Sequence, residues 1–232
     1  TFALLLWQGI VWLTGVPSFI LPSPLRVAQS AVDNRVLIAE NALVTATEVI
    51  LGLITGTVLG AFTAVHLANS DRLQRLVMPL LIFNQAVPVF ALAPILTLWF
   101  GYGIASKVVM AVLIIYFPVT SAFYDGLTRV PADILDMAKT MGGTKRQIMR
   151  PIKIPHALPS LGTGLKLAAV YAPIGAVIGE WVGASKGLGY LMLLANGRAK
   201  TDLMFASLFT LVVMKLLLSM AVTKASDYLS KP

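Results

Sequence analysis

The 232-residue chain carries a net charge of +8, and 57% of its residues are hydrophobic whereas only 12% are charged. A soluble domain averages about 25% charged residues, so this composition excludes an ordinary soluble protein and indicates a membrane protein. The chain has no cysteine, and its two histidines, His66 and His156, lie far apart in sequence, so we expect no metal site. The basic residues lie between apolar runs, where they set topology, and we expect no nucleic-acid partner.

Six apolar runs approach or exceed the roughly 20 residues that a membrane-spanning helix needs. They cover 2–16, which is short, 41–68, 76–100, 104–124, 157–182 and 203–226. Between the first two, prolines start a short helix whose apolar face lies on the membrane surface or against the bundle; this face comprises Leu25, Ala28, Ala31 and Val32. We therefore predict an all-α integral membrane protein of about six transmembrane helices, with residues 1–232 forming a single domain.

Lysine and arginine orient the bundle, because cytoplasmic loops of membrane proteins are enriched in them. One side of the membrane holds ten: Arg72, Arg75, Arg129, Lys139, Lys145, Arg146, Arg150, Lys153, Lys224 and Lys231. The other side holds six: Arg26, Arg35, Lys107, Lys186, Arg198 and Lys200. The richer side should be cytoplasmic, which places both termini and segment 125–156 there, with 184–202 outside.

Small residues recur every four positions in two of the spans. These are Gly52, Gly56 and Gly60, and Gly175, Gly179 and Gly183. Such ridges let helix backbones approach closely. They indicate either ordinary helix packing or faces that rock during a transport cycle.

Segment 129–156 predicts a cytoplasmic helix-turn-helix elbow. Pro131 suits the first turn of a helix, and Asp133 and Asp136 favour its positive N-terminus. Gly142 and Gly143 stop that helix, and a second short helix, 145–153, ends before Pro155. An apolar edge at three- and four-residue spacing would dock into a partner's groove; it comprises Ile134, Met137, Ala138 and Met141.

The spacing of Asp136-Met137-Ala138, Gly142, Ile152 and Ile154-Pro155 resembles the cytoplasmic loop of permease subunits of type I ABC importers. Their pattern is Glu-Ala-Ala, three residues, Gly, nine residues, Ile, one residue and Leu-Pro; here Asp, Met and Ile replace Glu, the first Ala and Leu. In that family the loop is the coupling helix, which sits in a cleft of the ATPase subunit. The resemblance implies an ATPase-coupling role for Ile134, Asp136, Met137, Ala138, Met141, Gly142, Gly143, Ile152, Ile154 and Pro155.

Segments 87–103, 117–119 and 178–192 resemble the nitrate, sulfonate and taurine branch of these permeases, and 187–208 resembles permeases for pyrimidine precursors of thiamine. The resemblance extends over about residues 20–228. It implies the type I importer transmembrane fold, a homodimer, two ATPase subunits and a periplasmic or lipid-anchored substrate-binding protein. It also implies a multi-pass protein, surrounded by lipid, in the bacterial cytoplasmic (inner) membrane.

The chain lacks the G-x-x-x-x-G-K-[ST] phosphate loop, so we expect it not to hydrolyse ATP by itself. No combination of residues suggests a catalytic site or a bound cofactor. The main alternative is an ion-coupled secondary transporter, which would need inverted repeats and a midplane ion site. A structural membrane scaffold without a pathway is a third possibility.

Polar residues inside spans are candidates for the translocation path, since they are costly in lipid. Asn84 and Gln85 precede Pro88, and Pro94 follows, so the third span should be bent or opened. The path candidates are Asn84, Gln85, Tyr116, Tyr171 and Glu180. Helix–helix hydrogen bonding is the alternative for the amides, and an ion pair with a nearby Lys or Arg is the alternative for Glu180.

Overall fold

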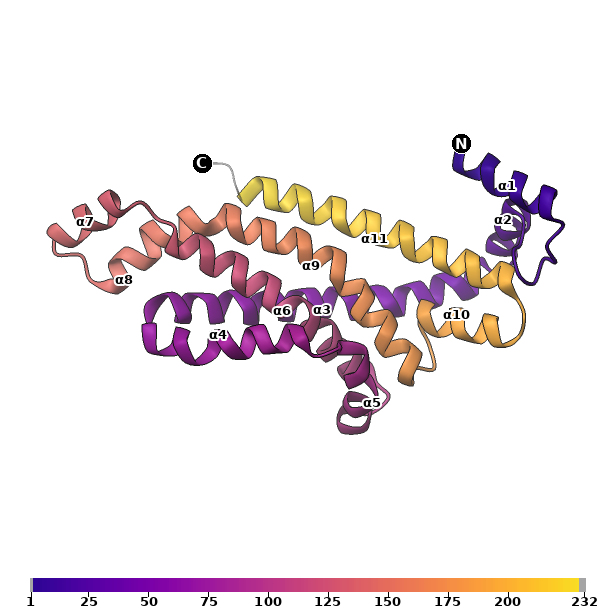
Figure 1. Cartoon of the computed structure of the whole chain (residues 1–232), viewed down its shortest axis with the longest axis horizontal. Coiled ribbons are helices and arrows are strands. Elements are labelled where there is room, and N and C mark those ends of the chain that lie inside the picture. The colour runs from indigo at the N-terminus through magenta and orange to yellow at the C-terminus, as the bar shows by residue number, and fades with distance from the viewer. Residues whose placement is uncertain (1, 230–232) are drawn as a thin grey trace.

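The structure, a computed structural model, describes residues 2–229 as helices arranged along one long axis (Figure 1). Four helices are long and apolar enough to cross a membrane: α3 (Arg35–Asn69), α6 (Ile104–Thr128), α9 (Ile154–Gly183) and α11 (Thr201–Leu229). Two shorter helices, α4 (Asp71–Ala86) and α5 (Val89–Phe100), are together apolar and long enough for a fifth span, in the form of a broken span or a re-entrant loop. Residues 2–229 contain no strand, so the all-α membrane fold is confirmed.

The expected span 2–16 forms α1 (Phe2–Thr14), which has only 13 residues. A helix of this length extends about 20 Å, less than the roughly 30 Å hydrocarbon core of a bilayer. Four of the six expected spans are therefore confirmed, or five if the bent pair of α4 and α5 is counted as one span. The short proline-started helix is also confirmed as α2 (Pro24–Asp33), with Ser23 as its N-cap. However, Val27 and Ser30 are its buried residues, and the predicted face points outward at Leu25 and Val32.

The third span bends by 101° between α4 and α5, as its prolines predict. Pro88 caps the start of α5 and supplies no amide hydrogen, so the helical hydrogen-bond ladder stops there. Asn84 Nδ2 donates to the carbonyl of Leu113 at 3.0 Å, which ties the end of α4 to α6. The bend is thus fixed by a proline on one side and a helix contact on the other.

The α6 helix lies between α3 and α9, and both glycine ridges pack against it. A Cβ added to Gly52 would come 2.6 Å from Ala111 Cβ, and one added to Gly175 would come 2.7 Å from Ala111 Cα. Neither position has room for a methyl group. The ridges therefore let two helices approach Ala111 from opposite sides.

Segment 184–202, expected as an outer loop, contains a further helix, α10 (Leu188–Gly197). Leu188 and Leu191 are buried, and α10 packs against α9, α11 and α3. The expectation was incomplete because a mostly apolar helix of ten residues is too short to cross a membrane and still has enough apolar surface to be buried against other helices.

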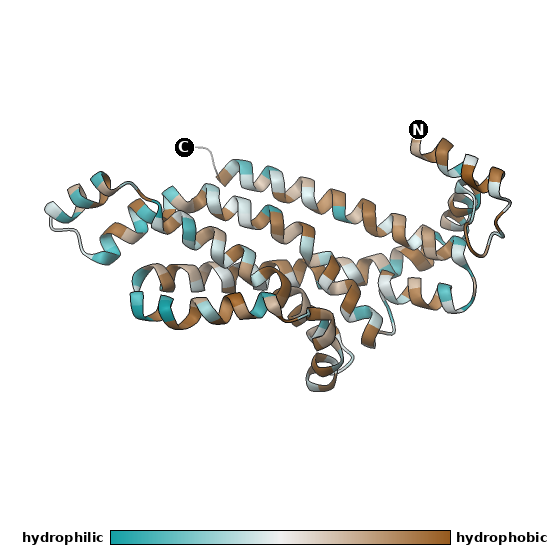
Figure 2. Cartoon of the chain, in the orientation of Figure 1, coloured by the Kyte–Doolittle hydropathy of each residue, from teal (hydrophilic) through white to brown (hydrophobic). Residues whose placement is uncertain are grey.

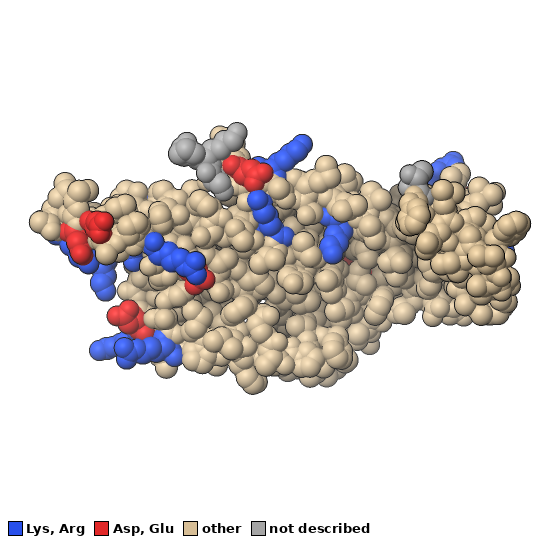
Figure 3. All heavy atoms as spheres, turned by 45° about the horizontal axis from the view of Figure 1, so that its top comes forward, with Lys and Arg blue, Asp and Glu red and all other residues tan. Residues whose placement is uncertain are grey.

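The two ends of the bundle differ in polarity. One end, here named the elbow end, carries α7 (Ala132–Thr140), α8 (Lys145–Ile148) and the turn between α3 and α4; the far end carries α1, α2 and α10 (Figure 1). Apolar residues run along the long helices, while hydrophilic residues gather around α7, α8 and the start of α4 (Figure 2). On the face in Figure 3, lysine and arginine side chains also lie mainly towards the elbow end. Lys231, counted for this end, lies outside the described residues.

Candidate functional site

The elbow begins with α7 and a tight glycine turn. Pro131 precedes α7, and the helix closes when the amide of Met141 donates to the carbonyl of Met137 at 3.0 Å. Gly142 then adopts a positive φ of 80°, and the amide of Gly143 donates to the carbonyl of Ala138 at 2.9 Å. A left-handed residue at this position favours glycine, so the predicted helix stop is confirmed.

A capping box, which the sequence analysis did not identify, starts α8. The amide of Thr144 donates to Gln147 Oε1 at 2.9 Å, and the amide of Gln147 donates to Thr144 Oγ1 at 3.4 Å. Threonine followed by glutamine three residues later is the sequence signal for this motif. The glycine turn and the capping box together fix the direction of α8 relative to α7.

The second elbow helix does not end before Pro155, so this expectation is wrong. A π-helical segment, Met149–Lys153, joins α8 to α9, and the amide of Ile154 donates to the carbonyl of Met149. In a regular α-helix the ring of Pro155 would clash with the carbonyl four residues earlier, and the wider π turn relieves that clash. The elbow is consequently joined to a spanning helix without a break.

The predicted coupling residues fall into two groups. Ile134, Met137 and Met141 are 41%, 62% and 80% exposed, whereas Ala138 is half-buried beneath them. We call the three exposed residues the ridge. Asp136 lies beside the ridge and pairs with Lys139 at 2.8 Å. The second group, Ile152, Ile154 and Pro155, lies at the junction with α9, where Ile154 packs against a buried cluster that includes Phe123 and Met149.

Two of the five path candidates line one groove. Gln85 from α4 and Tyr171 from α9 border a groove of about 560 Å³ against α6. Phe117, Ser121 and Asp125 of α6 line it too. Their four-residue spacing places them on one face of α6 and could have identified them, but the sequence alone does not show which face borders the groove. This groove combines aromatic walls with a few polar groups, which is typical of a site for a small solute.

Three path candidates lie elsewhere. Asn84 bonds to the α6 backbone, and the hydroxyl of Tyr116 lies 2.7 Å from Thr63 Oγ1 on α3. Glu180 is fully buried: one carboxylate oxygen accepts from Thr45 and the other from the amide of Gly189. No ion pair to Glu180 is present among residues 2–229. The contact of Asn84 favours the helix-packing alternative, and Tyr116 likewise bonds to a neighbouring helix, whereas the ion pair considered for Glu180 is absent and hydrogen bonds take its place.

Glu180 belongs to a larger buried cluster, which we name the bracket: Asn41, Thr45 and Glu180, with the amides that they bind. Asn41 Oδ1 accepts from the amide of Gly187, and Thr45 Oγ1 accepts from the amide of Leu188, each at 2.8 Å. The bracket therefore supplies partners for the first amides of α10, which a helix N-terminus leaves unpaired. Its sequence signal is weak because its members come from segments far apart in the chain.

Two more charged side chains are buried beside the bracket. Lys107 Nζ donates to the carbonyls of Tyr102 and Gly183. Glu48 is buried near Glu180, and its Oε2 has no hydrogen-bond partner among the described residues. Residues 2–229 contain no group of three His, Asp or Glu residues placed to hold a metal ion.

A membrane bundle with a groove for small solutes and an exposed helical ridge at one end has the features of a transport subunit. The sequence matches the family described as "Binding-protein-dependent transport system inner membrane component" over residues 56–231. The chain therefore belongs to this family of ABC transporter permease subunits.

Curated relatives agree with this assignment. A probable ABC transporter permease protein of Haemophilus influenzae is 48% identical over 215 residues, covering 93% of this chain and 88% of the relative. The formylaminopyrimidine transport permease ThiX of Halalkalibacterium halodurans is 37% identical over 227 residues, covering 97% and 90%. The riboflavin transport system permease RibX of Chloroflexus aurantiacus is 35% identical over 218 residues, covering 93% and 81%.

The fold is that of a type I importer permease. A chain from crystal structures of the MetNI methionine ABC transporter in inward-facing conformations superposes with a TM-score of 0.75 at 20% identity. The match covers 86% of this chain and 99% of the other. The resemblance to the nitrate, sulfonate and taurine branch is thereby confirmed in family and fold.

Proposed function

We propose that this chain, as the permease of an ABC importer, carries a small polar solute across the bacterial cytoplasmic membrane, with ATP hydrolysed by two separate subunits. A periplasmic or lipid-anchored binding protein delivers the solute, and two copies of the chain form the path. Each copy is one permease domain over residues 1–232 with its coupling elbow at about 129–156. The observation that carries this proposal is an exposed apolar ridge on α7, one tight glycine turn away from α8, which continues without a break into the spanning helix α9.

The ridge offers the ATPase an apolar surface to bind. Ile134, Met137 and Met141 project from α7 outside the spanning segments, and exposed apolar side chains gain free energy when a partner's groove covers them. Because α8 continues through the π turn into α9, a displacement of the elbow displaces α9 as well. Tyr171 lies on α9 and lines the groove, so ATPase closure changes the shape of the groove.

Among the solute classes, a flat heteroaromatic ring such as a pyrimidine precursor fits the groove better than a sulfonate or nitrate. Phe117 and Tyr171 offer aromatic faces, while Gln85 and Ser121 offer hydrogen-bonding groups. The relatives named for formylaminopyrimidine and riboflavin transport are 37% and 35% identical, against 28% and 24% for relatives named for aliphatic sulfonates and taurine. Membership of the ABC permease family argues against the alternative of an ion-coupled secondary transporter.

Purification of the tagged full-length permease from its native membrane tests this function. We expect a complex whose mass corresponds to two permeases and two ATPase subunits, and uptake that requires ATP and a binding protein. Single cysteines placed at Lys145 and Lys186 should react with a membrane-impermeant reagent from opposite sides. A permease that carries solute without an ATPase partner, or labelling of both cysteines from one side, would contradict the proposal.

A further inference from the structure

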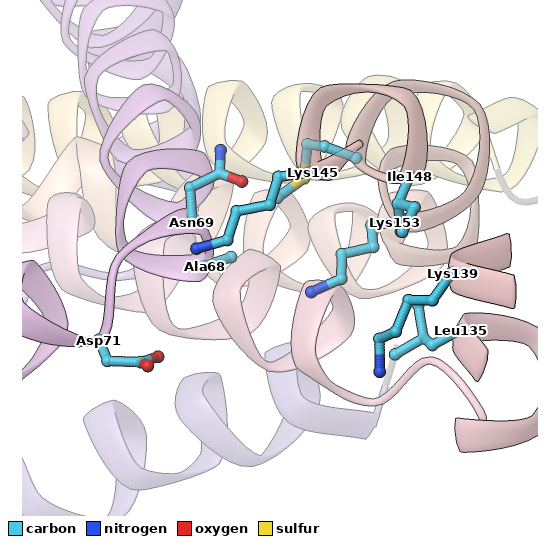
Figure 4. A pocket seen from close by; sticks show the side chains of 9 residues that line it. Ala68, Asn69, Asp71, Leu135, Lys139, Lys145, Ile148 and Lys153 are labelled. Carbon is cyan, nitrogen blue, oxygen red and sulfur yellow. The ribbon is translucent and has the colours of Figure 1, made fainter. Parts of the chain in front are cut away.

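A basic pocket lies between the elbow and the turn that joins α3 to α4. Its volume is about 440 Å³, and its walls include Ala68 and Asn69 at the end of α3, Leu135 of α7 and Ile148 of α8. Three lysines line it from three different segments: Lys139, Lys145 and Lys153 (Figure 4). Their ammonium groups reach into the open space between the elbow and the turn rather than into the helix bundle.

Among residues 2–229, acidic side chains balance only part of the positive charge of this pocket. Lys145 and Lys153 make no ion pair among residues 2–229, and Lys139 is paired only with the exposed Asp136. Asp71 is the only acidic residue that lines the pocket. A neighbouring hollow of about 480 Å³ shares Lys145 and adds Arg146 and Arg150. An excess of cations around a hollow attracts an anion.

The pocket also lies where the spanning helices end. The α3 helix stops at Asn69, and α9 begins at Ile154, just after Lys153. Apolar side chains, Leu135, Ile148 and Met149, form part of the wall beside the lysines. A ligand that fits this arrangement carries a negative head and an apolar body. Basic pockets between helices at the cytoplasmic membrane surface suit anionic lipid headgroups.

We propose that this pocket binds the phosphodiester headgroup of an anionic membrane lipid, with Lys139, Lys145 and Lys153 surrounding the phosphate. The lipid then bridges the α3–α4 turn and the elbow. Leu135 and Lys139 lie on α7 roughly a third of a turn away from the ridge, because successive residues are about 100° apart. The ATPase and the lipid therefore use different faces of α7. Anionic lipid holds the elbow in place and makes transport depend on membrane composition.

The test measures lipid retention by the purified full-length permease. The permease is titrated in phosphatidylcholine nanodiscs that contain increasing fractions of phosphatidylglycerol, and the bound phosphatidylglycerol is counted by native mass spectrometry. Each juxtamembrane lysine contributes about a fivefold factor, so K145Q/K153Q should bind phosphatidylglycerol about 30-fold more weakly than the wild type. The matched control, R72Q/R75Q, removes the same charge at the same end but changes no lining residue, and should retain wild-type binding.

Four outcomes would overturn the proposal. Equal retention by the wild type and K145Q/K153Q would show that the pocket does not hold the lipid. Equal losses in both double variants would indicate attraction to the charged surface alone. Displacement of phosphatidylglycerol by inorganic phosphate at comparable concentration would identify a free-anion site. Normal retention by K145Q/K153Q together with loss of ATPase association would assign the pocket to an acidic segment of the ATPase. None of these readouts depends on transport, so they separate this inference from the proposed function.

Discussion

The two ends of the bundle treat their side chains differently. At the far end, the bracket residues Asn41, Thr45 and Glu180 are buried and bind the amides that begin α10. At the elbow end, Met137 and Met141 are exposed, and Lys145 has no ion pair among residues 2–229. Both ends contain polar residues next to apolar helices. At the far end the bracket side chains bind one another and the amides that begin α10, which is what a structural support needs, although Oε2 of the neighbouring Glu48 has no hydrogen-bond partner among the described residues. At the elbow end, apolar surface and charge stay available, which is what a docking site needs. The bracket and the elbow therefore differ in whether their side chains find binding partners within the chain, and not in whether those side chains are polar.

Removal of the bracket carboxylate should have the largest effect on stability. Glu180→Ala removes the acceptor of the buried amide of Gly189 and one of the two acceptors of the Thr45 hydroxyl, which keeps the carbonyl of Asn41; the loss costs roughly 2–4 kcal/mol. The thermal midpoint of the detergent-solubilised permease, measured by fluorescence-detected size exclusion, should fall clearly. Glu40→Ala, an exposed change on α3, is the control and should match the wild type. A wild-type midpoint for Glu180→Ala would mean that the bracket is not a structural support.

Strain in the elbow turn should have a smaller and purely local effect. Gly142 has a positive φ of 80°, and an alanine there costs about 1–2 kcal/mol. Gly142→Ala should therefore weaken ATPase binding about tenfold, measured by titration, while the thermal midpoint of the bundle stays unchanged. At Gly197 an added Cβ also meets nothing within 4 Å and φ is not positive, so Gly197→Ala should bind normally. Unchanged binding by Gly142→Ala would show that the turn geometry does not matter for docking.

Loss of the capping box should be detected only inside the elbow. Thr144→Ala removes the side chain that accepts from the amide of Gln147, which costs about 1 kcal/mol. Local opening should become about fivefold more frequent, and trypsin should cleave next to Lys145 and Arg146 correspondingly faster. Thr140→Ala, an exposed threonine of the same elbow, serves as the control. Equal cleavage rates for Thr144→Ala and the wild type would argue against a structural role of the box.

The smallest effect is expected at an exposed ion pair. Lys166 Nζ lies 2.9 Å from Asp227 Oδ1 between α9 and α11, with both side chains partly exposed. Such pairs contribute about 0–1 kcal/mol, so Lys166→Gln should shift the thermal midpoint little. Lys215→Gln, on α11 without an ion pair among residues 2–229, gives the baseline. If Lys166→Gln lowered the thermal midpoint as much as Glu180→Ala does, burial would not explain the difference between the exposed ion pair and the buried bracket.

The sequence predicted the spans, the bend and the elbow because their signals are local. Apolar runs, paired prolines and the spacing from Asp136 to Pro155 can each be read within a short window. The bracket could not be predicted, since Thr45 and Glu180 are 135 residues apart and only folding brings them together. The junction at Pro155 was misread because a proline ends most helices, and only the backbone shows that a π turn accommodates it.

The central claim is that the ridge of α7 couples this permease to its ATPase. Met137→Asp puts a charge on the exposed ridge without disturbing any buried contact. Ala132→Asp puts the same charge on an exposed position of α7 that faces away from the ridge, because successive residues are about 100° apart. Loss of an interface anchor costs about 1–4 kcal/mol, so Met137→Asp should bind the ATPase roughly 5- to 900-fold more weakly and recover correspondingly less of it in a pull-down at matched membrane levels. Ala132→Asp should recover nearly the wild-type amount. Equal recovery by all three proteins, with unimpaired uptake, would contradict the claim.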